Sequence, residues 1–131
     1  MVWTAKTAGF GSLSVKERFE ALPQHLRKTI ERAKDSGLIV TRVWLFGSRG
    51  RMTSTEVGEA GGGSEVRSNS DFDLAFELND AKSWASFRTQ MIENPPSVYQ
   101  VDLINLNECQ GAIRDKIVSE GIVIYESTAS Q

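Results

Sequence analysis

Apolar residues recur at helical spacing in the first third of the chain. The run Ser14-Val15-Lys16-Glu17 has the form of a capping box, in which serine and glutamate satisfy each other's backbone N–H groups, and it predicts a short helix to about Leu22. Pro23 predicts the start of a second helix that ends near Gly37, because proline is favoured in the first helical turn. One face of this second helix carries Leu26, Ile30 and Ala33.

Four apolar runs predict β-strands between and after these helices. They cover residues 38–46, 72–78, 99–106 and 122–125. Asn79-Asp80 is expected to cap a third helix that continues to about Glu93, where Asn94-Pro95-Pro96 stops it. Asn107 is expected to open a last helix to about Ser119. Residues 1–131 therefore read as a single α/β domain without internal repeats.

Two segments do not fit this alternation. Residues 1–13 contain glycines and small polar residues, and they predict a flexible or partner-dependent arm. Residues 52–69 form a Gly-rich insert whose centre, Gly58 to Glu65, has the composition of a flexible linker. This insert lacks the flanking strand and helix of a phosphate-binding glycine loop, so a mobile surface excursion is the favoured interpretation. We also consider that it forms a lid or a partner-contacting arm.

Composition is typical of a compact intracellular protein. The chain has 131 residues, of which 40% are hydrophobic, and this length is sufficient to bury a core. Its net charge of −2 gives no general attraction to nucleic acid. The single Cys109 excludes an internal disulfide and suits a reducing cytoplasm, and an inert cysteine is favoured over a reactive one. No apolar stretch approaches bilayer length, and the N-terminus lacks a signal-peptide core.

Three aspartates lie at the start of or within the predicted strands and carry the candidate chemistry. Asp71 and Asp73 project to the same side of one strand, because side chains alternate along a strand. Asp102 lies in the next apolar run and could bring a third carboxylate to the same edge of the sheet. Adjacent carboxylates repel each other unless a cation lies between them, and Mg²⁺ prefers carboxylate oxygen together with substrate phosphates. The set predicts catalytic and metal-binding roles for all three residues, with a nucleoside triphosphate as substrate and two-metal in-line displacement as the chemistry.

A glycine-serine turn follows the first predicted strand and supplies the complementary half of a phosphate site. The small residues Gly47 and Ser48 let backbone N–H groups approach an anion closely. Ser48 can add its hydroxyl, and Arg49 or Arg51 can pair with phosphate oxygens. These four residues are the predicted nucleotide-binding set.

Each of these features has a simpler explanation when it is taken alone. A Gly-Ser pair is usually an ordinary turn, an Asp-x-Asp pair is usually a solvated strand edge, and Asp102 alone would be a surface residue. His25 is expected to face solvent or to form a local hydrogen bond rather than to act as a base. Aromatic residues are expected in the core rather than as base-stacking platforms. They are Trp44, Phe46, Phe72, Phe76, Trp84 and Phe87. The order of the aspartates within apolar runs nevertheless favours a metal site.

From about Leu22 to Glu126 the chain resembles a minimal nucleotidyltransferase of the DNA polymerase β-like superfamily, specifically the MNT type that is paired with a HEPN-domain toxin. The matching motifs are residues 45–49, 70–76 and 101–106, with a closing helix and strand at 117–126. The resemblance implies a small mixed β-sheet with helices packed mainly on one face, the polymerase β-like palm fold. It also implies that Gly47 and Ser48 hold the triphosphate, that Asp71 and Asp73 hold the metals, and that Asp102 is the third carboxylate.

The resemblance further implies a biological role. The protein would be a Mg²⁺-dependent protein adenylyltransferase that transfers AMP from ATP to a tyrosine of a HEPN-type ribonuclease toxin in a hetero-oligomer, and it would thereby act as the antitoxin. One alternative is a stoichiometric antitoxin that binds its toxin with little or no catalysis. Another is transfer to a small molecule such as an antibiotic, although such enzymes append a helical domain for which this chain has no room.

Overall fold

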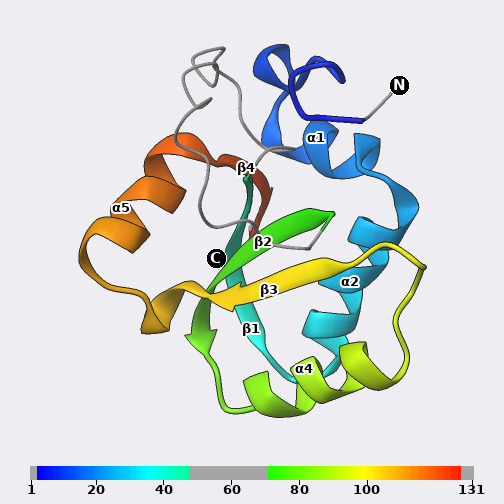
Figure 1. The fold of residues 1–131 in the computed structure, drawn as a ribbon, viewed down its shortest axis with the longest axis vertical. Coiled ribbons are helices and arrows are strands. Elements are labelled where there is room, and N and C mark those ends of the chain that lie inside the picture. Colours follow the sequence, from blue (N-terminus) through cyan, green and yellow to red (C-terminus); the bar gives the residue numbers. More distant parts are fainter. Residues whose placement is uncertain (1–2, 48–70, 128–131) are drawn as a thin grey trace.

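The computed structural model of the protein describes residues 3–47 and 71–127 (Figure 1). In these ranges four β-strands form one sheet, in the order β3-β2-β1-β4. The elements are η1 (Phe10–Ser12), α1 (Val15–Ala21), α2 (Gln24–Asp35), β1 (Ile39–Phe46), β2 (Phe72–Asp80), α4 (Trp84–Glu93), β3 (Val101–Asn105), η3 (Leu106–Glu108), α5 (Gly111–Glu120) and β4 (Ile122–Glu126). No helix in the described ranges is long and apolar enough to cross a lipid bilayer.

The sheet is mixed, as the family resemblance implied. β1 pairs antiparallel with both β2 and β4, whereas β2 pairs parallel with β3. Helix α4 provides the connection between the two parallel strands, which require a crossover of this kind. The predicted α/β class with a small mixed sheet is confirmed.

The two faces of the sheet are covered unequally. The larger core lies between the sheet and helices α1, α2 and α4, and its largest fully buried side chains include Phe10, Phe76 and Phe87. On the opposite face, α5 is the only helix of the described ranges that covers the sheet, and it packs on a small cluster of Trp44, Ala75, Leu106 and Ile117. Packing mainly on one face therefore leaves part of the α5 face of the sheet available for polar side chains.

Helix α1 begins with the predicted capping box. Ser14 Oγ accepts a hydrogen bond from the backbone N–H of Glu17 at 3.2 Å, and the Glu17 carboxylate accepts one from the N–H of Ser14 at 2.9 Å. The prediction of Leu26, Ile30 and Ala33 as the buried face of α2 is also confirmed.

Replacing Ser14 with alanine is expected to lower the free energy of unfolding by about 1 kcal/mol, because the N–H of Glu17 loses its cap. Chemical denaturation followed by far-ultraviolet circular dichroism measures this change. Ser86→Ala, at an exposed position within α4, is the matched control and should not destabilise the protein. A loss of equal size in both variants would contradict the capping argument.

Two helix starts differ from the sequence-based predictions. β2 continues to Asp80, and α4 begins only after Ser83, so Asn79-Asp80 does not cap this helix. Asp80 instead accepts a hydrogen bond from the N–H of Lys82 in the connecting turn. Similarly, Asn107 lies in η3 and not at the start of α5, because its side chain binds both the N–H and the carbonyl of Leu78 in β2. Side chains typical of helix caps are used here to fix turns against the sheet.

The N-terminal segment and His25 are more closely packed than the sequence predicted. Phe10 is fully buried, and the ring of Trp3 lies 5.4 Å from that of Phe10 in an edge-on arrangement, although a loose arm was predicted for residues 1–13. His25 is buried, with its ring stacked 4.9 Å from that of Tyr99, so it does not take the solvent-facing one of its two predicted placements. Aromatic partners that are distant in sequence account for both differences, because Trp3 also packs against Phe72 and His25 packs against Tyr99. The predicted Gly-rich insert, residues 52–69, lies outside the described residues.

Candidate functional site

Asp73 and Asp102 lie side by side on the two parallel strands. They are register partners in the β2–β3 pairing, and paired residues on neighbouring strands project to the same face at a strand spacing of about 4.8 Å. Leu74 and Leu103, the next pair along, point to the opposite face and belong to the large core. The two carboxylates therefore share the sparsely covered α5 face. Asp73 is half-buried and Asp102 is exposed.

Asp71 precedes the first residue of β2 and interacts with the start of β3. Its Oδ2 accepts a hydrogen bond from the N–H of Gln100 at 2.9 Å, and its own N–H donates to the carbonyl of Gln100 at 2.8 Å. A carboxylate has about four acceptor positions, so this one bond leaves acceptor capacity at Asp71. Hydrogen bonds of this kind orient carboxylates that ligate metals.

Gly47 places the bend at the end of β1 directly against Asp73. Phe46 is the register partner of Asp73, and Gly47 then turns with a φ of 77°, in the left-handed region that glycine tolerates best. A Cβ at position 47 would lie 2.2 Å from Asp73 Oδ2. Only glycine leaves room for the carboxylate of Asp73 at this point, so the bend and the aspartate form one structural unit.

The donor chemistry at this edge fits a hard divalent cation. Proteins usually contribute one or two carboxylate ligands to a bound Mg²⁺, and waters and substrate phosphates supply the rest. Two neighbouring carboxylates are therefore enough for such a site. Within residues 3–47 and 71–127, no three His, Cys, Asp or Glu side chains gather closely enough to hold a metal ion by themselves. The structure thus brings Asp73 and Asp102 together and leaves Asp71 beside them, joined to Gln100.

The other three predicted phosphate-binding residues lie outside the described part of the chain. They are Ser48, Arg49 and Arg51, and their nucleotide-binding roles stay predictions.

Gln100 is a residue of the site that the sequence analysis missed. It contacts Asp71 only through its backbone N–H and C=O groups. Since every residue except proline carries both groups, the identity of residue 100 gives no signal in the sequence. Recognition of this contact required the parallel pairing of β2 with β3.

Comparison with known proteins identifies one family. The family model described as "Polymerase beta, Nucleotidyltransferase" matches residues 27–130, which include the Gly47 bend and all three aspartates. Members of this family generally use a nucleoside triphosphate and a divalent metal ion. A search of curated proteins and a search of solved structures each found no match. The family match and the mixed sheet with its paired aspartates agree, and the chain belongs to the polymerase beta nucleotidyltransferase family.

Proposed function

We propose that the protein transfers AMP from ATP, in a Mg²⁺-dependent reaction, to a tyrosine hydroxyl of a HEPN-type ribonuclease toxin and so acts as its antitoxin. The observation that carries the transfer reaction is the pairing of Asp73 with Asp102 beside the Gly47 bend, within a nucleotidyltransferase family match. The choice of ATP, tyrosine and toxin rests on the resemblance of the three sequence motifs to the MNT type.

The residues of the chain have separate tasks in this reaction. Mg²⁺, held by Asp73 and Asp102 with Asp71 beside them, would neutralise charge on the triphosphate. Asp102 is exposed and can accept the proton of the attacking hydroxyl. The acceptor oxygen forms a bond to the α-phosphorus, the bond from that phosphorus to the bridging oxygen breaks, and pyrophosphate leaves. Positioning and electrostatic stabilisation supply most of the rate increase.

One observation favours a second candidate function. No group of three metal-binding side chains is formed within residues 3–47 and 71–127. A stoichiometric antitoxin, which binds its toxin with little or no catalysis, would not need such a group. The double variant Asp71→Asn with Asp73→Asn separates the two functions, because a binding antitoxin would still neutralise its toxin after both substitutions.

The reaction is tested by intact-mass analysis. The protein is incubated with ATP, Mg²⁺ and the product of the neighbouring gene, which the proposal expects to be a HEPN-domain protein. The proposal predicts a mass gain of one or more AMP units on the partner, located at a tyrosine by peptide sequencing. Absence of any gain with ATP, GTP, CTP and UTP would overturn the catalytic proposal and favour stoichiometric inhibition.

Metal binding has a readout that does not depend on activity. We expect Mg²⁺ together with a non-hydrolysable ATP analogue to raise the Tm of the protein by several degrees, since a ligand present at 100 times its Kd stabilises by about 2.7 kcal/mol. Asp73→Asn should abolish most of this increase. The change in Tm with Ca²⁺ in place of Mg²⁺ serves as the comparison. An equal rise in Tm for the variant and the unmodified protein would place the metal elsewhere.

A further inference from the structure

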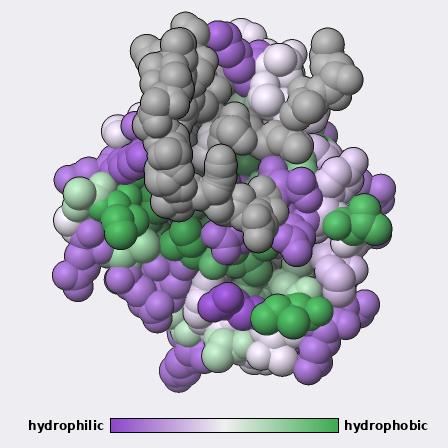
Figure 2. Space-filling model, in the orientation of Figure 1, coloured by the Kyte–Doolittle hydropathy of each residue, from purple (hydrophilic) through white to green (hydrophobic). Residues whose placement is uncertain are grey.

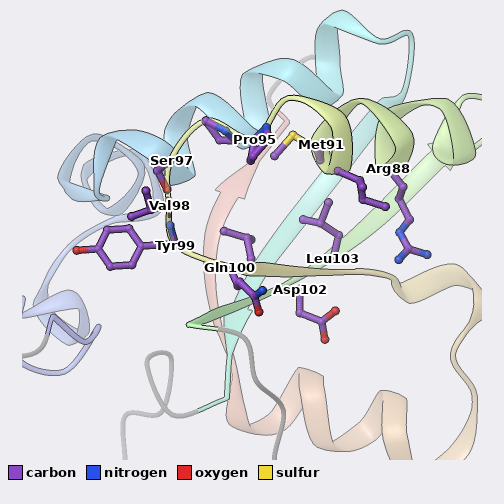
Figure 3. A pocket seen from close by; sticks show the side chains of 12 residues that line it. Arg88, Met91, Pro95, Ser97, Val98, Tyr99, Gln100, Asp102 and Leu103 are labelled. Atoms are coloured by element: carbon purple, nitrogen blue, oxygen red, sulfur yellow. Dashed lines mark hydrogen bonds between the residues drawn. The ribbon is translucent and has the colours of Figure 1, made fainter.

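A groove of about 700 Å³ runs along the outer side of β3 and beneath α4 (Figure 3). Its apolar lining includes Met91 and Ile92 from α4, Val98 from the loop between them, and Leu103 from β3. Ile92 is 74% exposed and Val98 is 92% exposed, and both line this groove. Exposed apolar side chains that line one groove are typical of an interaction site. Figure 2 shows exposed hydrophobic residues over the end of α4 and the loop that leads into β3.

The groove follows an edge of the sheet whose backbone groups point outward. The carbonyl of Gln100 accepts from the N–H of Phe72, so even-numbered residues of this strand bond to β2. By alternation, the N–H and C=O groups of Val101 and Leu103 point away from β2. Within the part of the chain that the structure describes, no other element hydrogen-bonds to these groups.

The other edge of the sheet differs in this respect. Arg18 of α1 donates a hydrogen bond at 3.0 Å to the carbonyl of Val123 in the edge strand β4. Edge strands left without such contacts are templates for the addition of a further strand. Among the strands of the described ranges, the edge left open is therefore β3, the strand that carries Asp102.

The two sides of β3 have different chemistry. Leu103 points toward Met91 on α4, whereas Asp102 and Gln100 point to the opposite side (Figure 3). An extended segment paired with β3 would also alternate, with one set of side chains against the apolar floor and the other set beside Asp102. One end of the groove is fixed, because Tyr99 stacks on His25 at 4.9 Å.

From this arrangement we infer that β3 and α4 form the docking site for an extended segment of the acceptor protein, which adds as a strand to the edge of β3. The inference rests on the proposed nucleotidyl transfer, and it adds which acceptor sequences the protein would recognise. The acceptor hydroxyl lies on a residue whose side chain falls beside Asp102. The residues immediately before and after it are apolar, and they contact Ile92, Met91 and Leu103.

The first test measures binding without nucleotide, so that it does not depend on catalysis. The probe is a fluorescein-labelled synthetic peptide with a central tyrosine flanked on both sides by valine, threonine at the next positions and lysine at both ends. Its control has the same composition with the two valines moved together to one end. We expect the first peptide to bind and the control to bind at least about tenfold more weakly, because apolar anchors dominate such interfaces.

Two matched variants locate the binding surface. Ile92→Lys places a charge in the groove, and Ile113→Lys makes the same change at a 62% exposed position on α5, outside it. We expect Ile92→Lys to weaken peptide binding about tenfold and Ile113→Lys to leave it unchanged. In amide hydrogen exchange, bound peptide should slow exchange at Val101 and Leu103. Failure of the peptide to bind, equal binding by both variants, or protection at other strands would overturn the inference.

Transfer to the same peptide, measured with labelled ATP and Mg²⁺, separates this inference from the proposed function. Labelling that is unaffected by Ile92→Lys would overturn the docking site and leave the reaction intact. Binding that depends on Ile92, with no labelling of the peptide or of any partner, would overturn the reaction and leave the docking site intact.

Discussion

Asp73→Asn is expected to reduce nucleotidyl transfer by at least about a thousandfold, because the substitution removes one of the two paired carboxylates that would stabilise charge during the reaction. Asp73 is central to the site in two ways: it is the register partner of Asp102 and it contacts the Gly47 bend. The rate of AMP incorporation, measured at saturating ATP and Mg²⁺, gives the effect directly.

Asp80→Asn provides the matched control. It makes the same substitution at the other end of β2, where the side-chain oxygen of asparagine can still accept the hydrogen bond from the N–H of Lys82. This variant should keep the transfer rate of the unmodified protein. If Asp73→Asn were as active as Asp80→Asn, Asp73 would have no role in transfer.

Gly47→Ala is expected to lower both stability and transfer. The added Cβ would lie 2.2 Å from Asp73 Oδ2, so the carboxylate has to move, and alanine at a φ of 77° adds backbone strain. We expect the free energy of unfolding to fall by about 1–3 kcal/mol and transfer to fall about a hundredfold or more, since displacements near 1 Å at a reacting centre have effects of this size.

Gly9→Ala separates the two causes. Gly9 has a φ of 76°, almost the same as that of Gly47, but nothing lies within 4 Å of a Cβ at that position. The free energy of unfolding of Gly9→Ala should therefore fall only by the cost of backbone strain, about 1 kcal/mol. The transfer rate of this variant should not change. Loss of transfer in Gly9→Ala equal to that in Gly47→Ala would show that stability, and not the position of Asp73, limits the rate.

Elements with local signals were predicted well from the sequence. The capping box at Ser14, the buried face of α2 and the four apolar strands are all present in the structure. Each of these signals depends on residues within a few positions of one another, so hydrophobic period and capping chemistry identify them.

Features that depend on distant contacts could not be predicted in the same way. Asn107 has the residue type of a helix cap, yet it binds the backbone of Leu78 on another strand. Trp3 and Phe10 looked like parts of a loose arm because Trp3, which packs against Phe10, has its other aromatic partner, Phe72, on β2, far along the chain. Tertiary packing decided the conformation in both cases.

The candidate site shows the same division. The residue types and the spacing of Asp71, Asp73 and Asp102 predicted carboxylates at one sheet edge, and the parallel register of β2 and β3 places two of them side by side. The contact between Asp71 and the N–H of Gln100 has no signal in the sequence, because a backbone group makes it.

The most direct measurement is a crystal structure of the protein with Mg²⁺ and a non-hydrolysable ATP analogue. The account predicts an ion coordinated by carboxylate oxygens of Asp73 and Asp102 at about 2.1 Å, with the triphosphate beside Gly47. An ion held by other residues, or a triphosphate bound away from the edge where β2 and β3 meet, would contradict it.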